Sequence, residues 1–302
     1  MQQRPRGLFI VSCRICVPPQ VGTHIRLFFL FSELMTSANE IISYMESLRN
    51  ESQRRILMRF FKTGPGQYGE GDEFLGLKVP QTREVVKSVG RSLPLAEVPP
   101  LLLSPWHEVR LCGLLILVDA FERQATRRLA ADPSAIRQRD AILTTYLRYA
   151  ERANNWDLVD LTAPKILGHW LLLPTHLGEG LPDGADPLRL AYKREVLDGL
   201  AASDSLWRQR MSIVCTWKTS QQGDASWCLR YAEVHLRHPH DLMHKAVGWM
   251  LREMGKRVSM DLLRDFLRQH ASAMPRTTLR YAIEKMSAAE RRHWMTLTPA
   301  HS

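Results

Sequence analysis

Nearly every segment of this chain after Met35 has the spacing of apolar residues that is typical of α-helices. No run shows the strict alternation of apolar and polar residues that a half-buried β-strand requires. The chain must therefore bury its apolar surface by packing helices on helices, and we expect an all-α fold. The predicted helices cover residues 38–62, 80–92, 95–103, 106–125, 134–153, 155–172, 187–202, 204–220, 224–237, 241–256, 259–271 and 275–286.

These helices form a loose repeat. The second helix of each proposed pair begins near His107, Asn155, Leu206 and Leu242, at spacings of 48, 51 and 36 residues. Helix pairs of this length are typical of HEAT-like α-solenoids, in which each pair packs mainly on its neighbours. We therefore predict a HEAT-like α-solenoid, an ARM-like superhelix of stacked helix pairs. Such a stack curves, so its concave face forms a groove for a long ligand.

The charge balance of the chain is strongly basic. It has 41 Lys and Arg against 31 Asp and Glu, a net charge of +10 at pH 7, in a chain of 302 residues. Apolar residues make up 45% and charged residues 24%, which excludes a wholly disordered chain, a collagen and a multispan membrane protein. The excess of cations favours polyanionic partners, nucleic acid first and anionic membrane second. We expect the concave groove to be basic.

The first 34 residues differ from the rest of the chain. They carry four Arg and one Glu, and their apolar run Leu27–Phe31 is too short to cross a bilayer. A transit peptide is one interpretation. We favour a disordered extension, or a mis-started one if translation begins at Met35. The predicted organisation is therefore an extension at 1–34, one α-solenoid domain at 35–290 and a C-terminal tail at 291–302.

Signatures of cofactor and metal chemistry are missing from the sequence. It lacks the GxxxxGK[ST], GxGxxG, HExxH and GxSxG motifs, so we expect no cofactor. Cys13 and Cys16 form a CxxC pair, but no second pair lies nearby to complete a zinc site, and we expect no metal. The five cysteines are few and scattered, which indicates a reducing compartment. Without a secretion signal, the predicted location is the cytoplasm.

One predicted helix, residues 241–256, places an aromatic residue among cations. Lys245, Trp249, Arg252 and Lys256 share one side of it, about 200° around from its apolar face. A tryptophan flanked by cations is the arrangement expected where a protein stacks on nucleotides and binds their phosphates. The alternative is that Trp249 covers the edge of a helix interface and that the cations are simply solvated.

The segment NNWDLVD, residues 154–160, places a tryptophan and a carboxylate together. Trp156 and Asp160 are four residues apart and project from one side of a helix, for which Asn154 is the predicted N-cap. Asp157 would lie in the first turn, where the helix dipole stabilises it. Asp160 lies further along among apolar residues, so it needs either an internal ion pair or a function.

Arg210 lies on an otherwise apolar face of the predicted helix 204–220. A guanidinium in such surroundings costs free energy unless it meets an anion or its long stem reaches the surface. The anion can be Asp160, Glu195 or a phosphate group, and the sequence leaves these alternatives open.

Five segments resemble the AlkD-like DNA alkylation repair family, in the same order and over residues 40–287, most of the chain. They are FFKTGPGQYGEGDEFLGLKVPQTR (60–83), NNWDLVD (154–160), LWRQRMSIV (206–214), HKAVGWMLREMGK (244–256) and MPRTTLRYAIEK (274–285). The family has the HEAT-like fold predicted above. Its characterised members are DNA glycosylases for cationic alkylated purines such as 3-methyladenine and 7-methylguanine, so the resemblance implies a monofunctional hydrolase of base excision repair.

The resemblance also implies four catalytic residues, Asp160, Trp156, Trp249 and Arg210. Asp160 would stabilise an oxocarbenium-like sugar and orient the attacking water. The two tryptophans would pack against the deoxyribose and the cationic base, and Arg210 would hold a phosphate beside the lesion. Because members of this family need not flip the base deeply, the resemblance implies an open groove.

The remaining expectations concern DNA contacts and partners. We expect DNA-binding residues at Lys245, Arg252, Lys256, Arg208 and Tyr68. The expected partner is double-stranded DNA with alkylated bases, bound by a monomer, with no membrane and no nucleotide cofactor. The protein would then associate with the nucleoid when on DNA. Two other functions stay open: a non-catalytic HEAT-like protein that binds branched or damaged DNA, and a protein-binding scaffold with an acidic partner.

Overall fold

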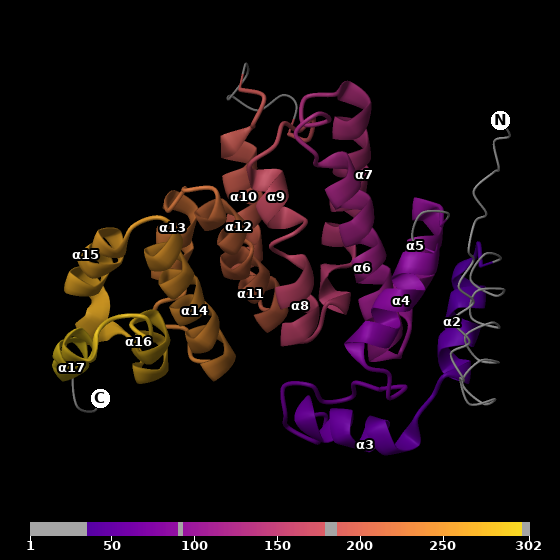
Figure 1. Cartoon of the computed structure of the whole chain (residues 1–302), viewed down its shortest axis with the longest axis horizontal. Coiled ribbons are helices and arrows are strands. Elements are labelled where there is room, and N and C mark those ends of the chain that lie inside the picture. Colours follow the sequence, from indigo (N-terminus) through magenta and orange to yellow (C-terminus); the bar gives the residue numbers. More distant parts are fainter. Residues whose placement is uncertain (1–34, 90–92, 179–185, 298–302) are drawn as a thin grey trace, which may run out of the picture.

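The computed structural model describes residues 35–89, 93–178 and 186–297, and these residues form a stack of helices (Figure 1). Within these ranges there is no strand, only one isolated bridge between Glu73 and Trp106. The all-α fold and the helical solenoid are therefore confirmed. No helix in the described part of the chain is long and apolar enough to cross a membrane. The predicted extension at 1–34, with Cys13 and Cys16, lies outside the described residues.

The helices follow one another along the stack from the N-terminal to the C-terminal side of the molecule. The first half contains α2 (Ala38–Ser47), α3 (Glu51–Phe60), α4 (Val79–Val89), α5 (Val98–Leu103), α6 (His107–Gln124), α7 (Pro133–Arg148), α8 (Trp156–Thr162) and α9 (Leu167–Leu171). The second half contains α10 (Leu190–Ala201), α11 (Leu206–Val214), α12 (Thr216–Gln221), α13 (Ser226–Val234), α14 (Asp241–Arg257), α15 (Met260–His270), α16 (Arg276–Ala282) and α17 (Ala288–Thr296).

Three predicted helices are each divided in two, and each break has a local cause. The predicted helix 38–62 is α2 and α3, because the Asn50 side chain accepts a hydrogen bond from Gln53 and starts a new helix. The predicted helix 155–172 is α8 and α9, separated at Pro164, which has no amide proton to donate. The predicted helix 204–220 is α11 and α12, and the Thr216 hydroxyl at their junction donates to the Ile213 carbonyl.

The C-terminal end contains a helix that the periodicity does not predict. The predicted boundary at residue 290 falls inside α17, which begins with a capping box formed by Ser287 and Glu290. Trp294 of this helix is buried, and Glu290 accepts hydrogen bonds from Arg264 of α15. The helical stack therefore continues to Thr296, into the predicted tail.

A row of four helices runs through the centre of the stack. α6 packs on α8, α8 on α11 and α11 on α14. These helices begin at His107, Trp156, Leu206 and Asp241, within one residue of the starts predicted for the second helices of each pair. The repeat spacing therefore predicted which helices share one face of the stack, and this row carries most of the candidate site residues.

Side-chain contacts join the first two turns of these four helices along one edge of the row. His107 of α6 contacts Asp157 of α8, Asp160 of α8 pairs with Arg210 of α11, and Arg210 reaches the Leu242 carbonyl of α14. The first turns of α6, α8 and α14 carry Glu108, Asp157 and Asp241, whose carboxylates interact favourably with the positive ends of the helix dipoles. In the view of Figure 1, α3 lies below the lower ends of α4, α6 and α8.

Close packing between α14 and α16 depends on a glycine. A Cβ atom at position 248 would lie 2.5 Å from both the Thr278 carbonyl oxygen and the Tyr281 Cβ atom. Gly248 therefore allows the two helices to approach more closely than any other residue would. The core is apolar along the whole stack, and the buried thiols of Cys112, Cys215 and Cys228 are unbridged within it.

Candidate functional site

A paired carboxylate and guanidinium lie at the centre of the helix row. The Arg210 Nε and Nη2 atoms donate to the two carboxylate oxygens of Asp160 at 2.8 and 2.9 Å. The side chain of Asp160 remains 18% exposed, whereas that of Arg210 is only 5% exposed. Burial raises the pKa of the Asp160 carboxyl above its usual range, and the Arg210 charge opposes that rise. The carboxylate is thus held in one orientation with one side open to solvent.

Arg210 connects three helices of the row. In addition to its two bonds to Asp160, its Nη1 atom donates to the Leu242 carbonyl at the start of α14. The sequence left Asp160, Glu195 and a phosphate as possible partners of Arg210, and the structure shows that the partner is Asp160. The guanidinium is buried in the protein. This geometry favours a role in orienting the carboxylate, and the phosphate contact implied by the resemblance stays a prediction.

Trp156 is the first residue of α8 and is half-buried among aromatic rings. Its ring centroid lies 5.5 Å from that of Phe61 and 6.0 Å from that of Phe60. Phe60 is 58% exposed, so this cluster continues to the protein surface. The predicted cap is wrong by one residue: Asn155, not Asn154, caps α8, because its side-chain oxygen accepts from the Trp156 amide. Trp156 and Asp160 lie one turn apart on α8, as predicted.

Trp249 lies on α14, about two turns from the Leu242 carbonyl that Arg210 binds. Its side chain is half-buried and packs against the edge of the core. The structure therefore places this indole partly in a helix interface and partly at the surface. Both interpretations of the sequence, a cover for the interface and a stacking surface, remain compatible with that position.

Most of the predicted DNA-binding cations are engaged with carboxylates. The pairs are Lys245 with Asp241 at 2.7 Å, Arg208 with Glu151 at 3.3 Å, and Arg252 with Glu253 at 3.3 Å and with Glu284. Lys256 is exposed at the end of α14. The basic face is therefore interleaved with acids, and DNA phosphates would compete with these partners for the cations. The assignment of these residues to DNA binding stays a prediction.

Tyr68 belongs to the segment 62–75, which connects α3 to the rest of the stack. Its ring contacts the Trp207 ring of α11, with centroids 6.1 Å apart. Gly69, the next residue, packs against the Phe61 carbonyl and the side chain of Asn155, where a Cβ atom would not fit. The segment therefore lies against the starts of both α8 and α11, beside the residues described above.

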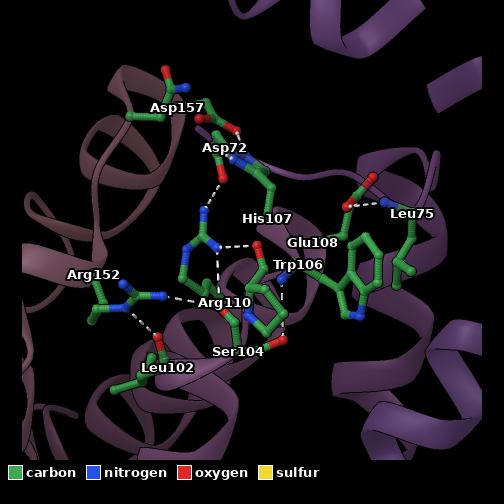
Figure 2. Close-up of polar contacts among 12 residues, drawn as sticks. Asp72, Leu75, Leu102, Ser104, Trp106, His107, Glu108, Arg110, Arg152 and Asp157 are labelled. Atoms are coloured by element: carbon green, nitrogen blue, oxygen red, sulfur yellow. Dashed lines mark hydrogen bonds and ion pairs between the residues drawn. The ribbon is translucent and has the colours of Figure 1, made fainter. Parts of the chain in front are cut away.

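A buried polar network that the sequence analysis did not predict holds the segment 62–75 in place. His107 Nδ1 lies 2.8 Å from Asp72 and His107 Nε2 lies 3.0 Å from Asp157, so the imidazole connects the segment to α8 (Figure 2). Asp72 also accepts from Arg110, which donates in turn to the Ser104 carbonyl at 3.0 Å. All of these side chains are buried except for a small part of Asp157.

The same network fixes the backbone that follows Asp72. Both carboxylate oxygens of Glu108 accept hydrogen bonds from consecutive amides of Leu75, Gly76 and Leu77, at 2.8 to 3.0 Å. The separation of these groups along the chain explains why sequence patterns did not reveal them. The only local signal was the run of ionisable residues HEVR at the start of a helix that is otherwise apolar.

Nowhere in the described part of the chain do three or more His, Cys, Asp or Glu residues converge in a way that could hold a metal ion. The structure brings together an oriented carboxylate, a guanidinium and flanking aromatic rings at the candidate site. Such a set can stabilise a developing positive charge and contact a planar or sugar ring.

Comparisons with known proteins agree with the helical fold. The family model described as DNA alkylation repair enzyme matches residues 41–286. Among solved structures, a predicted DNA alkylation repair enzyme from Enterococcus faecalis superposes with a TM-score of 0.58. It is 12% identical, and the alignment covers 80% of this chain and 97% of that chain, so the likeness shows the fold alone. No curated protein matches the sequence.

Proposed function

The chain belongs to the DNA alkylation repair enzyme family, and from that premise we propose that it is a DNA glycosylase for cationic alkylated purines. Family membership makes it an enzyme of DNA repair and implies DNA as its partner. The proposed reaction hydrolyses the N-glycosidic bond of 3-methyladenine- or 7-methylguanine-type bases in duplex DNA. The observation that carries the proposal is the oriented, partly exposed Asp160 carboxylate beside Trp156.

The chemistry of a cationic purine suits such a site. A purine alkylated at N3 or N7 already carries a positive charge, so it can leave without protonation by a strong acid. The sugar that remains develops oxocarbenium character, which a nearby anion stabilises. Asp160 provides that anion in a fixed geometry, because both its oxygens are held by Arg210. In this proposal Arg210 orients the carboxylate and favours its charged form.

Trp156 and the exposed ring of Phe60 provide the surface beside the carboxylate. A cationic base or a deoxyribose packs favourably on an electron-rich indole face. Asp160, one turn further along α8, would then lie next to the sugar and could also orient the attacking water. All of these groups come from a single chain, so a monomer can carry out the proposed reaction.

Binding of the DNA backbone is supported by the edge of the helix row. Side-chain contacts join the first two turns of α6, α8, α11 and α14 there, and α14 carries the cation Lys245 in its second turn. Trp249 and Lys256 lie further along α14. We propose that this edge follows one DNA strand past Asp160, in an open groove that does not require deep flipping of the base.

The proposal is tested by measuring base release from duplex DNA treated with a methylating agent. We compare the parent chain with Asp160→Asn and with Asp198→Asn, which alters an Asp–Arg pair at 2.8 Å elsewhere in the stack. We expect Asp160→Asn to lower the single-turnover rate by about 10²- to 10³-fold while duplex affinity changes little. Asp198→Asn should match the parent.

Two results would contradict the proposal. Release by Asp160→Asn at the parent rate would remove the carboxylate from the reaction. No release by the parent, together with salt-sensitive duplex binding, would instead identify a non-catalytic protein that binds branched or damaged DNA.

A further inference from the structure

The imidazole of His107 is placed between two carboxylates that belong to different parts of the site. Its Nδ1 atom lies 2.8 Å from Asp72 in the segment 62–75, and its Nε2 atom lies 3.0 Å from Asp157 in the first turn of α8 (Figure 2). The side chain of His107 is 2% exposed. Among the described residues, Asp157 is the residue of α8 to which the ring is hydrogen-bonded.

The face of the same ring is part of an aromatic stack that ends at Trp156. The Phe74 ring stacks on His107 with centroids 4.4 Å apart and an interplanar angle of 18°. Phe61 lies 5.0 Å from His107 and 5.5 Å from Trp156. The imidazole is therefore connected to Trp156 in two ways. One is through the packed aromatic rings, and the other is through Asp157, which follows Trp156 in the chain.

The backbone of His107 provides a further link to the segment 62–75. Its amide donates to the Glu73 carbonyl at 2.7 Å, next to the Asp72 carboxylate that its side chain binds. The middle of the segment carries Tyr68, which contacts Trp207 of α11. His107 thus joins the segment 62–75, referred to below as the Tyr68 segment, to the helix that carries Trp156 and Asp160.

We propose that His107 is a positioning residue that holds the Tyr68 segment and the first turn of α8 in one fixed arrangement around the scissile position. Its effect on base release rests on the proposed function, whereas the coupling of the two elements does not. The residue would act through Asp72 and Asp157, without touching the substrate.

Donation to both carboxylates requires the imidazolium form, because a neutral ring has only one N–H group. Burial disfavours the charged ring, but Asp157 and Asp72 outweigh it and raise the pKa of His107 to about 9. The charged groups that face this cluster are Arg110 from α6, Arg152, and Asp160 further along α8. The charged ring therefore provides both hydrogen bonds at neutral pH.

Two amide variants separate the two hydrogen bonds. In His107→Asn the amide nitrogen takes the place of Nδ1, which keeps the bond to Asp72 and loses the one to Asp157. In His107→Gln it takes the place of Nε2, which keeps Asp157 and loses Asp72. The control is His169→Gln. His169 lies on α9, and its Nδ1 atom is 3.1 Å from the Lys165 carbonyl oxygen, so it takes no part in the contacts of His107.

Three measurements are made on each full-length variant: single-turnover base release, duplex affinity and amide hydrogen exchange. We expect both His107 variants to slow release by about 10- to 100-fold, because a displacement of about 1 Å has that effect. Duplex affinity should stay within about threefold of the parent. Exchange should rise at residues 69–75 in His107→Gln and at residues 156–160 in His107→Asn.

The outcomes are distinguishable. Release by both His107 variants at the rate of His169→Gln overturns the inference. If the parent releases no base, the proposed function fails, and hydrogen exchange alone tests the role of His107. If exchange does not rise at residues 69–75 in His107→Gln and at residues 156–160 in His107→Asn, His107 does not couple the two segments. If the variants do not fold, hydrogen exchange of the parent is measured above about pH 9, where the His107 ring loses a proton. Exchange in both segments should then rise relative to the intrinsic rates, and unchanged protection would overturn the inference.

Discussion

The protonated ring of His107 gives this protein a pH-dependent contribution to stability whose sign follows from its surroundings. Burial alone would lower the pKa of the imidazole, but the charges and hydrogen bonds of Asp157 and Asp72 raise it from 6.5 to about 9. A group whose pKa is higher in the folded state binds protons more tightly there. Its contribution is therefore fully present below about pH 6.5 and is lost as the pH rises through about 9.

The magnitude follows from the size of that change. One pKa unit corresponds to about 1.4 kcal/mol, so the ring stabilises the fold by roughly 3 kcal/mol at acidic pH relative to alkaline pH. Lys193 has the opposite dependence, because burial lowers the pKa of its ammonium group from 10.5 to about 7. Stability gained there between about pH 7 and 10.5 would mask the loss at His107 in the parent alone.

A comparison of two chains isolates the His107 contribution. We would measure the free energy of unfolding in urea for the parent and for His107→Gln, at about pH 6 and about pH 9.5. Lys193 and all other groups are common to both chains, so their titrations cancel in the difference. We expect the difference between the chains to shrink by about 3 kcal/mol over this range. A difference that stays constant within about 0.5 kcal/mol would refute the assignment of a charged ring.

The remaining predictions concern packing and DNA binding. Gly248→Ala should destabilise the protein by about 1–3 kcal/mol in urea unfolding, because the added Cβ meets α16. Gly199→Ala, with open space around its Cβ position in α10, should stabilise it by about 0.5–1 kcal/mol, and equal effects would contradict the packing argument. Lys256→Ala should lower the slope of log affinity for duplex DNA against log salt by about 1. Arg252→Ala should lower it less, because Glu284 already neutralises that guanidinium, and an equal loss would show that DNA displaces the pair.

Much of the fold could be predicted from the sequence, because its determinants are local. Helical periodicity depends on residues three and four apart, and the spacing of the second helices identified the row α6, α8, α11 and α14. The errors have local causes as well. Pro164 and the Asn50 cap interrupt runs whose apolar spacing continues across the break, so periodicity alone merges the two helices on either side.

The site could be predicted only where its residues are neighbours on one helix. Trp156 and Asp160 share a turn of α8, and a carboxylate and a guanidinium on apolar faces indicated that each needed a partner. The sequence could not identify Asp160 as the partner of Arg210, because the two residues lie 50 positions apart and on different helices. His107 is 35 residues from Asp72 and 50 from Asp157, and its role depends on three separate elements meeting in space.

The arrangement around Asp160 bears on which bases the proposed site can release. The ionisable groups next to this carboxylate are Arg210, which donates two hydrogen bonds to it, and Asp157, which is bound to His107. Both nitrogens of His107 are engaged and buried, so its proton is not available to a departing base. A site built in this way stabilises a developing cation better than it protonates a neutral leaving group. In the proposed reaction the positive charge that expels the base then comes from the substrate, which suits the cationic purines that the resemblance implies.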